Sequence, residues 1–332
     1  MLASWLQRQW FGQRRLVPAL WFLVPLSWLY AWIAERRRRR TQPAYLPVPV
    51  VVVGNITVGG AGKTPLTLGI VQALCARGWH PGIVSRGYGS RASAPRPVLP
   101  ESVAVDVGDE PILLARRSAC PVWVGRDRVA AGHALLAAHP EVDLIICDDG
   151  LQHYRLARDV ELAVFDGRGV GNAWRLPAGP LREPLARLAE VDAVVFNGTS
   201  DLVVSAARPT FSMQLELGDA YRLDAPNVRR PLAEFSGTPV FALAGIGNPA
   251  RFFDALTARG LHVDARPFPD HHAYSPADLA FGSKDILLMT EKDAVKCAGL
   301  SPGEIWVVPV DAKLPTGLIE LILEKLRGRQ AP

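Results

Sequence analysis

A glycine-rich segment between an apolar run and a helix-like run constrains the fold of this chain most strongly. The segment reads GNITVGGAGKTP over residues 54–65. It follows PVPVVVVG, a β-branched run typical of a buried parallel strand, and precedes a run that favours a helix ending at Gly78. This order predicts a phosphate-binding loop, or P-loop. Thr57 occupies the position at which the usual pattern G-x-x-x-x-G-K-[ST] has its first glycine.

The loop supplies the groups that hold a nucleoside triphosphate. Glycines let the backbone turn its N–H groups toward phosphate oxygens, and the helix N-terminus adds a partial positive charge. Lys63 is expected to reach the β- and γ-phosphates, and the Thr64 hydroxyl to bind Mg²⁺. The alternative is a tight turn with an incidental lysine, which the complete strand, loop and helix pattern disfavours. The predicted ATP-binding residues are Thr57, Val58, Gly59, Gly60, Ala61, Gly62, Lys63 and Thr64.

Two adjacent carboxylates offer the acidic metal ligands that a P-loop site requires. The run DLIICDDGLQH predicts a buried strand at residues 144–147, with Asp148 and Asp149 at its C-terminal edge. Ligands of open parallel sheets bind at that edge. We therefore expect the pair to hold Mg²⁺ or its water, and solvated turn residues are the alternative.

Two further motifs place a carboxylate and a histidine pair far apart in the sequence. VGDEP puts Asp109 ahead of a predicted helix, where it could also serve as the N-cap. FPDHHAYS puts His271 and His272 near a turn, where histidines are often simply solvated. If the two segments face each other across a cleft, the carboxylate and a histidine form a base and the group that orients it.

Basic side chains occur in two glycine- or proline-containing motifs. GPLREP carries Arg182 and Glu183, which could neutralise a transferring phosphate or form an ordinary surface pair. SRGYG carries Arg86 and Tyr88, which suit an anionic sugar-phosphate or a solvated turn. The residues alone leave both alternatives open for each motif.

Strands alternate with helices along the chain, which predicts an α/β fold with a P-loop NTPase-like, mostly parallel sheet. Strands are expected at residues 82–85, 122–124, 144–147 and 162–165, and helices near 110–117, 128–139 and 185–189. The pattern becomes extended near residue 211, and a second α/β series follows. The predicted parts are an N-terminal membrane-associated helix and basic run (1–40), a core lobe (41–210), an extended linker (211–235) and a smaller α/β lobe (236–332).

The N-terminus combines positive charge with apolar residues. Residues 1–40 contain eight arginines and one glutamate, whereas the net charge of the whole chain is +5. This concentration favours an anionic membrane surface and argues against nucleic acid as a partner. Residues 16–34 are uncharged and just long enough to span the core of a bilayer. They are expected to cross the membrane or to lie in its interface, with the arginine run in the cytoplasm; a buried core helix is the third alternative.

The ordered motifs GGAGKTP, SRGYG, VGDEP, DDGLQH, GPLREP, FPDHHAY and TEKDAVK closely resemble those of the tetraacyldisaccharide 4'-kinase family, the lipid A 4'-kinases of Gram-negative bacteria. The resemblance extends from the apolar N-terminus to about Asp311. It implies transfer of the γ-phosphate of ATP to the 4'-hydroxyl of a lipid A disaccharide 1-phosphate, at the cytoplasmic face of the inner membrane. It also implies two lobes and an N-terminal helix that contacts the bilayer.

The resemblance assigns roles position by position. Asp109 matches the proposed base, His271 its partner and Lys63 the phosphate-binding lysine, while Thr64 and the aspartate pair match the Mg²⁺ site. Ala61 departs from the family, because many members have Thr or Ser there, but the backbone cradle is kept. Further active-site positions match Glu110, Gln152, Arg182 and Glu183.

Two other functions compete with a kinase. A membrane-associated P-loop NTPase could hydrolyse the nucleotide as a switch or to drive a partner. A GTPase is disfavoured, because neither NGTSD nor TEKD supplies the guanine-reading N-K-x-D. A lipid-binding module with a purely structural loop is disfavoured by the intact Lys63, Thr64 and aspartate pair.

Overall fold

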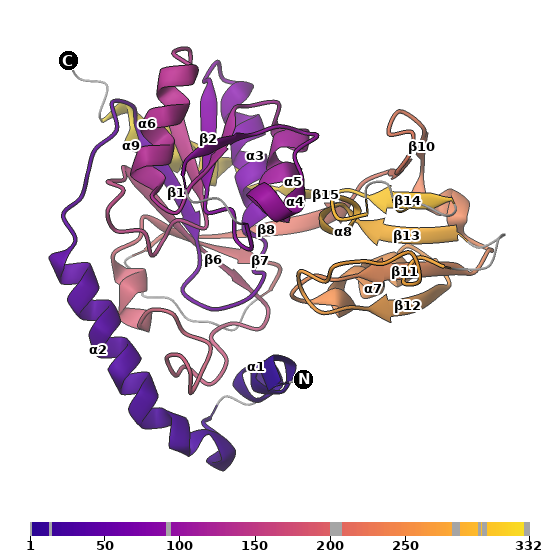
Figure 1. Cartoon of the computed structure of the whole chain (residues 1–332), viewed down its shortest axis with the longest axis horizontal. Coiled ribbons are helices and arrows are strands. Elements are labelled where there is room, and N and C mark those ends of the chain that lie inside the picture. Colours follow the sequence, from indigo (N-terminus) through magenta and orange to yellow (C-terminus); the bar gives the residue numbers. More distant parts are fainter. Residues whose placement is uncertain are drawn as a thin grey trace.

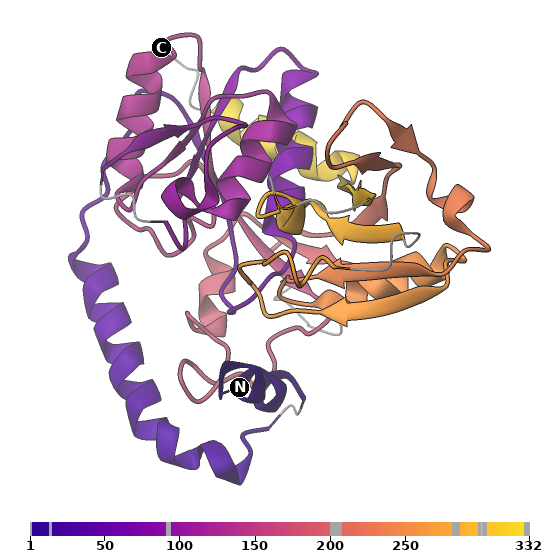
Figure 2. The same cartoon turned by 45° about the vertical axis from the view of Figure 1, so that its right-hand side comes forward.

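The computed structural model describes residues 2–12, 15–90, 94–199, 208–280, 286–297, 300 and 304–328. Within them the chain forms two β-sheets with helices packed around them (Figures 1 and 2). The larger sheet has the strand order β15-β8-β7-β6-β1-β5-β2-β4-β3, and the smaller has the order β10-β9-β14-β13-β11-β12. The predicted α/β class is confirmed.

The elements have the following bounds. The strands of the larger sheet are β1 (Val50–Gly54), β2 (Pro81–Ser85), β3 (Arg96–Val98), β4 (Val122–Val124), β5 (Leu144–Asp148), β6 (Val160–Asp166), β7 (Ala193–Asn197), β8 (Thr210–Leu217) and β15 (Val310–Lys313). Those of the smaller sheet are β9 (Ala220–Arg222), β10 (Arg229–Arg230), β11 (Val240–Ala244), β12 (Val263–Pro267), β13 (Ile286–Thr290) and β14 (Ile305–Val308). The α-helices are α1 (Leu2–Gly12), α2 (Val24–Arg40), α3 (Lys63–Cys75), α4 (Ala104–Val107), α5 (Asp109–Ser118), α6 (Arg128–Ala138), α7 (Pro249–Ala258), α8 (Glu291–Ala294) and α9 (Thr316–Arg327). The 3-10 helices are η1 (Pro18–Leu23), η2 (Leu185–Ala189) and η3 (Leu232–Phe235).

The larger sheet is parallel except at its two edges. β1 lies between β5 and β6 and pairs in parallel with both. The parallel pairing continues from β5 to β2 and β4 on one side, and from β6 to β7 and β8 on the other. β3 and β15 pair antiparallel at the two ends. All five residues of β1 are buried, as expected for a central strand covered on both faces. The sequence patterns did not predict β7 or the short edge strand β3.

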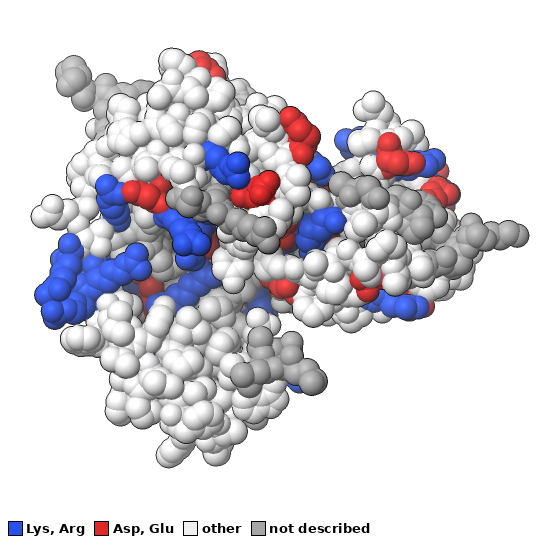
Figure 3. All heavy atoms as spheres, in the orientation of Figure 1, with Lys and Arg blue, Asp and Glu red and all other residues white. Residues whose placement is uncertain are grey.

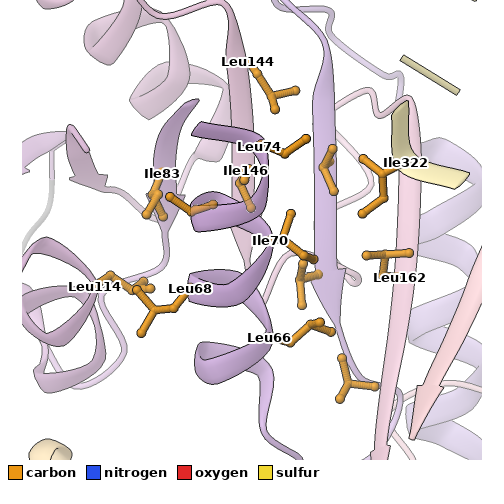
Figure 4. Close-up of a cluster of buried hydrophobic side chains, with 14 of the residues drawn as sticks. Leu66, Leu68, Ile70, Leu74, Ile83, Leu114, Leu144, Ile146, Leu162 and Ile322 are labelled. Carbon is orange, nitrogen blue, oxygen red and sulfur yellow. The ribbon is translucent and has the colours of Figure 1, made fainter. Parts of the chain in front are cut away.

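The helix that follows the glycine-rich loop is held by its apolar face. Leu66, Ile70 and Leu74 of α3 are fully buried and point toward the central strands, near Ile146 of β5 and Leu162 of β6 (Figure 4). Burying each such side chain stabilises the fold by about 1.5–3 kcal/mol. This packing fixes the start of α3, and therefore the loop, at the carboxyl edge of the sheet.

The chain leaves the larger sheet and later returns to it. β8 and β15 pair antiparallel, with Leu217 opposite Val310, and both belong to the larger sheet. The predicted linker (211–235) therefore contains most of β8, followed by β9 and β10 of the smaller sheet. The C-terminal segment, predicted within the smaller lobe (236–332), instead packs α9 into the core around α3 through Leu318 and Ile322. An amphipathic pattern does not specify which sheet a helix will cover, so the predicted boundary differs here.

The apolar N-terminal stretch forms two segments. Pro18 and Pro25 lie in the first turns of η1 and α2, where the missing N–H of proline removes no helical hydrogen bond. α2 has 17 residues and ends in the arginine run. Within the described part of the chain, no helix combines the length and apolarity that crossing a membrane requires.

Candidate active site

The glycine-rich loop connects β1 to α3. Gly59 and Gly62 have φ angles of 97° and 95°, in the left-handed region that favours glycine. At Gly62 a Cβ atom would also collide with the side-chain amide of Asn197. These two positions therefore require glycine for the chain to turn from the strand into α3.

Thr57 occupies a position that does not require glycine. Its backbone forms an antiparallel bridge with Leu181, and its φ angle lies outside the left-handed region. The next residue, Val58, donates its N–H to the carbonyl of Pro180 (2.9 Å). The departure from the usual P-loop pattern is thus explained by pairing between the first half of the loop and the GPLREP segment.

Two side chains from neighbouring strand ends hold the second half of the loop. Asn197 Nδ2 donates to the Ala61 carbonyl (3.2 Å), and Arg168 Nη2 donates to the Gly60 carbonyl (3.0 Å). The Ala61 side chain is buried in the core. Asn197 ends β7 and Arg168 follows β6, so both lie at the carboxyl edge of the sheet. That position could have indicated a place in the site, but neither residue was predicted to belong to it.

Lys63 is the first residue of α3, and its ammonium faces the acidic pair. Nζ lies 3.5 Å from Asp149 Oδ1 and donates to Asn55 Oδ1 at 3.3 Å. The side chain is 10% exposed, so its charge acts in a partly desolvated environment.

Asp148 ends β5 and is fully buried. Thr67 donates its hydroxyl to Oδ1 (2.8 Å), whereas Oδ2 has no hydrogen-bond partner among the described residues. Burial, followed by the charges of Glu110 and Asp149, raises the pKa of Asp148 to about 7. A buried carboxylate oxygen without a partner, beside a phosphate-binding loop, fits a site completed by a cation.

Asp149 differs from its neighbour because two cations face it. Burial would raise its pKa, but the charges of Lys63 and Arg182 outweigh burial and lower the pKa. Among the described residues, no group of three or more His, Cys, Asp or Glu side chains could hold a metal. Mg²⁺ usually binds one or two carboxylates together with phosphate oxygens, so Thr64 and the aspartate pair fit Mg²⁺ that arrives with a nucleotide.

The structure brings Asp109 and His271 together across the two lobes. Gly108 is the N-cap of α5 and Asp109 its first residue, so Asp109 is not the N-cap. Asp109 Oδ2 lies 3.0 Å from His271 Nδ1. Burial would raise the pKa of Asp109, but the His271 hydrogen bond and the charge of Lys292 outweigh it and lower the pKa. The same hydrogen bond raises the pKa of His271.

Glu110 and Asp270, the chain neighbours of that pair, contact one lysine. Lys292 Nζ donates to Glu110 Oε1 (2.9 Å) and to Asp270 Oδ1 (3.0 Å). Burial would lower the pKa of Lys292, but the carboxylates outweigh burial and raise it. Lys292 was not predicted, because TEKDAVK reads locally as the start of a helix. Thr290 indeed caps α8 by accepting from the N–H of Asp293.

Arg182, Gln152 and Glu183 form a network beside Asp149. Arg182 Nη1 lies 3.3 Å from Asp149 Oδ1 and donates to Gln152 Oε1 at 3.3 Å. Gln152 Nε2 in turn donates to Glu183 Oε2 (2.7 Å), and burial raises the pKa of Glu183. Tyr30 of α2 donates its hydroxyl to the Arg182 carbonyl (3.2 Å). The N-terminal helix therefore supports the loop that carries Arg182.

Arg86 and Tyr88 lie in the turn after β2, and both side chains are exposed. The ring centroids of Tyr88 and His271 are 5.2 Å apart, so Tyr88 borders the Asp109–His271 pair. Burial lowers the pKa of the Arg128 guanidinium at the start of α6, and the charge of Arg86 lowers it further. Of these two predicted residues, Tyr88 has a contact that places it at the pair.

A cavity of about 230 Å³ lies between the P-loop and the smaller sheet. Arg251 of α7 lines it and donates to Asn197 Oδ1 at 2.5 Å. Burial lowers the pKa of Arg251, because its guanidinium is partly removed from water. Arg251 was not predicted, since its place in the site depends on packing between the lobes. The polar wall includes Gly60, Gly62, Lys63 and Thr64, and the apolar wall includes Leu68, Leu113, Leu215, Leu217, Ile246, Phe252, Ala255 and Val310.

Comparisons with known proteins relate the whole chain to one family. The profile described as tetraacyldisaccharide-1-P 4'-kinase, LpxK, matches residues 19–327. A tetraacyldisaccharide 4'-kinase of Dechloromonas aromatica is 61% identical over 331 residues, which cover 99% of each chain. One of Methylobacillus flagellatus is 48% identical and covers 98% of this chain and 96% of its own. The crystal structure of "apo" form LpxK from Aquifex aeolicus in complex with ATP has a TM-score of 0.80 at 29% identity, covering 93% of this chain and 99% of that one.

Proposed function

The chain belongs to the tetraacyldisaccharide-1-P 4'-kinase family and is an ATP-dependent kinase of lipid A biosynthesis, and we propose that Asp109 is the base of its phosphoryl transfer. The acceptor is the 4'-hydroxyl of the tetraacyldisaccharide 1-phosphate. One observation carries the proposal: Asp109 and His271 form a hydrogen bond across the two lobes, beside the P-loop. An ionised carboxylate held at that place can remove a proton from an alcohol bound next to the γ-phosphate.

In the proposed reaction Asp109 accepts the proton of the 4'-hydroxyl while the hydroxyl oxygen attacks the γ-phosphorus. The bond between that phosphorus and the bridging oxygen of ADP breaks, and ADP leaves with the electron pair. His271 keeps the carboxylate oriented through its Nδ1 contact. Lys63 and the loop N–H groups offset negative charge on the β- and γ-phosphates.

Thr64, Asp148 and Asp149 would hold Mg²⁺, which when bound supplies positive charge to the phosphate oxygens. Oδ2 of the buried Asp148, which has no hydrogen-bond partner in the described part of the chain, supports this assignment. Arg182 would neutralise the transferring phosphate, with Gln152 holding its guanidinium in place.

We place the nucleoside end of ATP in the cavity next to Thr64. The cavity begins at the P-loop and continues between apolar side chains of both lobes, which suits a purine ring. Arg251 enters from the smaller lobe and bonds an amide oxygen, so its guanidinium retains donors for the phosphate chain. Tyr88 and Arg86 would contact the sugar-phosphate acceptor at the other side of the Asp109–His271 pair.

We propose that the N-terminal segment lies on the cytoplasmic face of the inner membrane. Figure 3 shows a largely uncharged lower end on this face, with Lys and Arg side chains above it. Tryptophans suit the bilayer interface, and the arginines that follow suit anionic headgroups. The apolar side chains that are more than half exposed there are Trp21, Phe22, Leu26, Trp28, Leu29, Trp32 and Ile33.

The test is transfer of labelled γ-phosphate from ATP to detergent-dispersed tetraacyldisaccharide 1-phosphate. Wild type is compared with Asp109→Ala, Lys63→Ala and, as a control, Lys313→Met, which removes an exposed lysine of β15. Label in the lipid that is lost in the first two variants but kept in the third supports the assigned roles. Label found entirely as free phosphate would favour an NTPase and remove Asp109 from its role.

A further inference from the structure

We infer that Lys292 is a positioning residue that sets the geometry between Asp109 and His271. The two members of the pair lie on different lobes, so their contact depends on how the lobes dock. Lys292 bridges Glu110, which follows Asp109 in α5, and Asp270, which precedes His271. One ammonium therefore ties together the two backbone segments that carry the pair. The inference rests on the proposed role of Asp109.

Lys292 is itself held firmly. Thr290 caps the short helix α8, and Glu291 forms a 2.5 Å ion pair with Arg117 near the other end of α5. α8 therefore contacts α5 at two places: Lys292 contacts Glu110 at the start of α5, and Glu291 contacts Arg117 near the end of α5. A side chain on such a support has little freedom, and the Lys292 side chain is only 15% exposed.

Loss of the ammonium has a specific consequence for the pair. Glu110 and Asp270 would face each other without a cation, and like charges at short range repel. The loop with Asp270 and His271 would shift away from α5, since both carboxylates are one residue from the pair. A displacement of about 1 Å at a catalytic group can lower the rate about 100-fold.

Lys292 lines the cavity in which we place ATP, but its ammonium is already committed to two carboxylates, which separates its role from phosphate binding. Lys63 is the lysine whose position in the P-loop serves the nucleotide. We therefore expect Lys292 to affect the rate of transfer and not the affinity for ATP.

The experiment compares Lys292→Met with Lys292→Arg and with Lys313→Met. Lys313 forms an exposed ion pair with Glu216 between β15 and β8, away from the pair, so its variant controls for loss of a lysine ion pair. We expect Lys292→Met to lower kcat about 100-fold while the directly measured Kd for ATP changes less than about threefold. Lys292→Arg should recover most of the loss, and Lys313→Met should match wild type.

The pH profile gives a readout that a merely structural role would not move. Asp109 is faced by His271 and Lys292 from the smaller lobe, by Lys296 at longer range, and by Glu110 from its own helix. Without Lys292 the acidic limb of the pH profile of kcat/KM should move to higher pH. The reason is that the Lys292 cation and a well-placed His271 no longer favour the ionised carboxylate of Asp109.

The inference is decided by the following outcomes. Unchanged kcat in Lys292→Met overturns it, and so does an equal loss of rate and ATP affinity with an unmoved pH profile. If Lys292→Met does not fold by circular dichroism, Asp270→Asn tests the same bridge and should give a smaller fall in kcat with the same sign. A wild type that transfers no phosphate refutes the proposed function, whereas an active wild type with an unaffected Lys292→Met refutes this inference alone.

Discussion

The Nδ1 atom of His271 lies 3.0 Å from Oδ2 of Asp109, although 162 residues separate the two in the sequence. This contact joins the smaller lobe to the helix α5 of the larger one. Asp109 lies on the larger lobe and His271 on the smaller one, so their contact forms only when the lobes dock. Docking of the lobes therefore also assembles the proposed base and its partner.

Replacing Asp109 by Asn should abolish most phosphate transfer while leaving nucleotide binding intact. Asn can still accept from His271, so the lobes remain docked, but it cannot take a proton. We expect kcat to fall by a factor of about 100 to 10,000, the usual contribution of a general base. Single-turnover transfer and equilibrium ATP binding measure the two effects. A decrease in rate of less than about threefold would contradict the role of Asp109.

The contribution of the Asp109–His271 contact to stability should depend on pH in a defined window. The pKa of Asp109 is lowered from an ordinary value of 3.8, so its contribution is present above that value and is lost as pH falls through the lowered pKa. The pKa of His271 is raised from 6.5, so its contribution is present below 6.5 and is lost as pH rises through the raised pKa. The difference in Tm between wild type and His271→Gln should therefore be largest between pH 4 and 6.5 and shrink in alkali. A constant difference from pH 5 to pH 9 would show that the contact is not charge-assisted.

Asp148→Asn should stabilise the metal-free protein while impairing catalysis. The pKa of Asp148 is raised from 3.8 to about 7, so the ionised carboxyl destabilises the fold above pH 3.8, by a few kcal/mol once pH exceeds 7. Asn removes this charge and can still accept from Thr67. We expect a higher Tm at pH 8 in a chelator, together with a much higher Mg²⁺ concentration for half-maximal activity. A lower Tm in the chelator would indicate that the carboxylate is stabilised by the protein alone.

Thr57→Gly restores the usual P-loop pattern but should not improve nucleotide binding. Thr57 pairs with Leu181 in extended conformation, where glycine loses more conformational entropy on folding, by about 0.5–1 kcal/mol. We expect a Tm lower by about 2 °C and a KM for ATP within about threefold of wild type. A marked gain in ATP affinity would show that the threonine had limited the loop.

The exposed tryptophans of the N-terminal segment should carry membrane binding. Trp21, Trp28 and Trp32 are 66%, 65% and 59% exposed, and the arginine run follows them. We expect the triple replacement by Ala to lower cosedimentation with anionic vesicles by at least tenfold, whereas Val228→Ser, on the smaller lobe, should have no effect. Equal binding of the triple variant would place the membrane contact elsewhere.

The parts of the site that could be predicted from the sequence are those whose chemistry is local. The P-loop and the carboxylates after β5 each lie within one strand-turn-helix or strand-turn unit, so their residues mark their own position. The Asp109–His271 contact was left open by the residues and was suggested by the family resemblance. Lys292, Asn197 and Arg251 escaped prediction, because their roles arise from packing between elements whose local patterns are ordinary.

The fold was predictable for the same reason, and the errors in the predicted fold have a physical cause. Apolar runs bounded by turn residues indicated β1, β2, β4, β5 and β6, but an amphipathic helix such as α9 carries no information about which sheet it covers. The side of the molecule on which α9 packs is decided by the return of β15 to β8.

The pairing of β8 with β15 has a mechanical consequence. The smaller lobe is an insertion into the P-loop domain, entered and left through two adjacent hydrogen-bonded strands, and not a module appended to its end. The inserted lobe is therefore anchored at two neighbouring points on one sheet, whereas an appended module would be anchored at one. Two anchor points restrict rotation of the lobe more than a single linker would, and they restrain His271 relative to Asp109 in the same way.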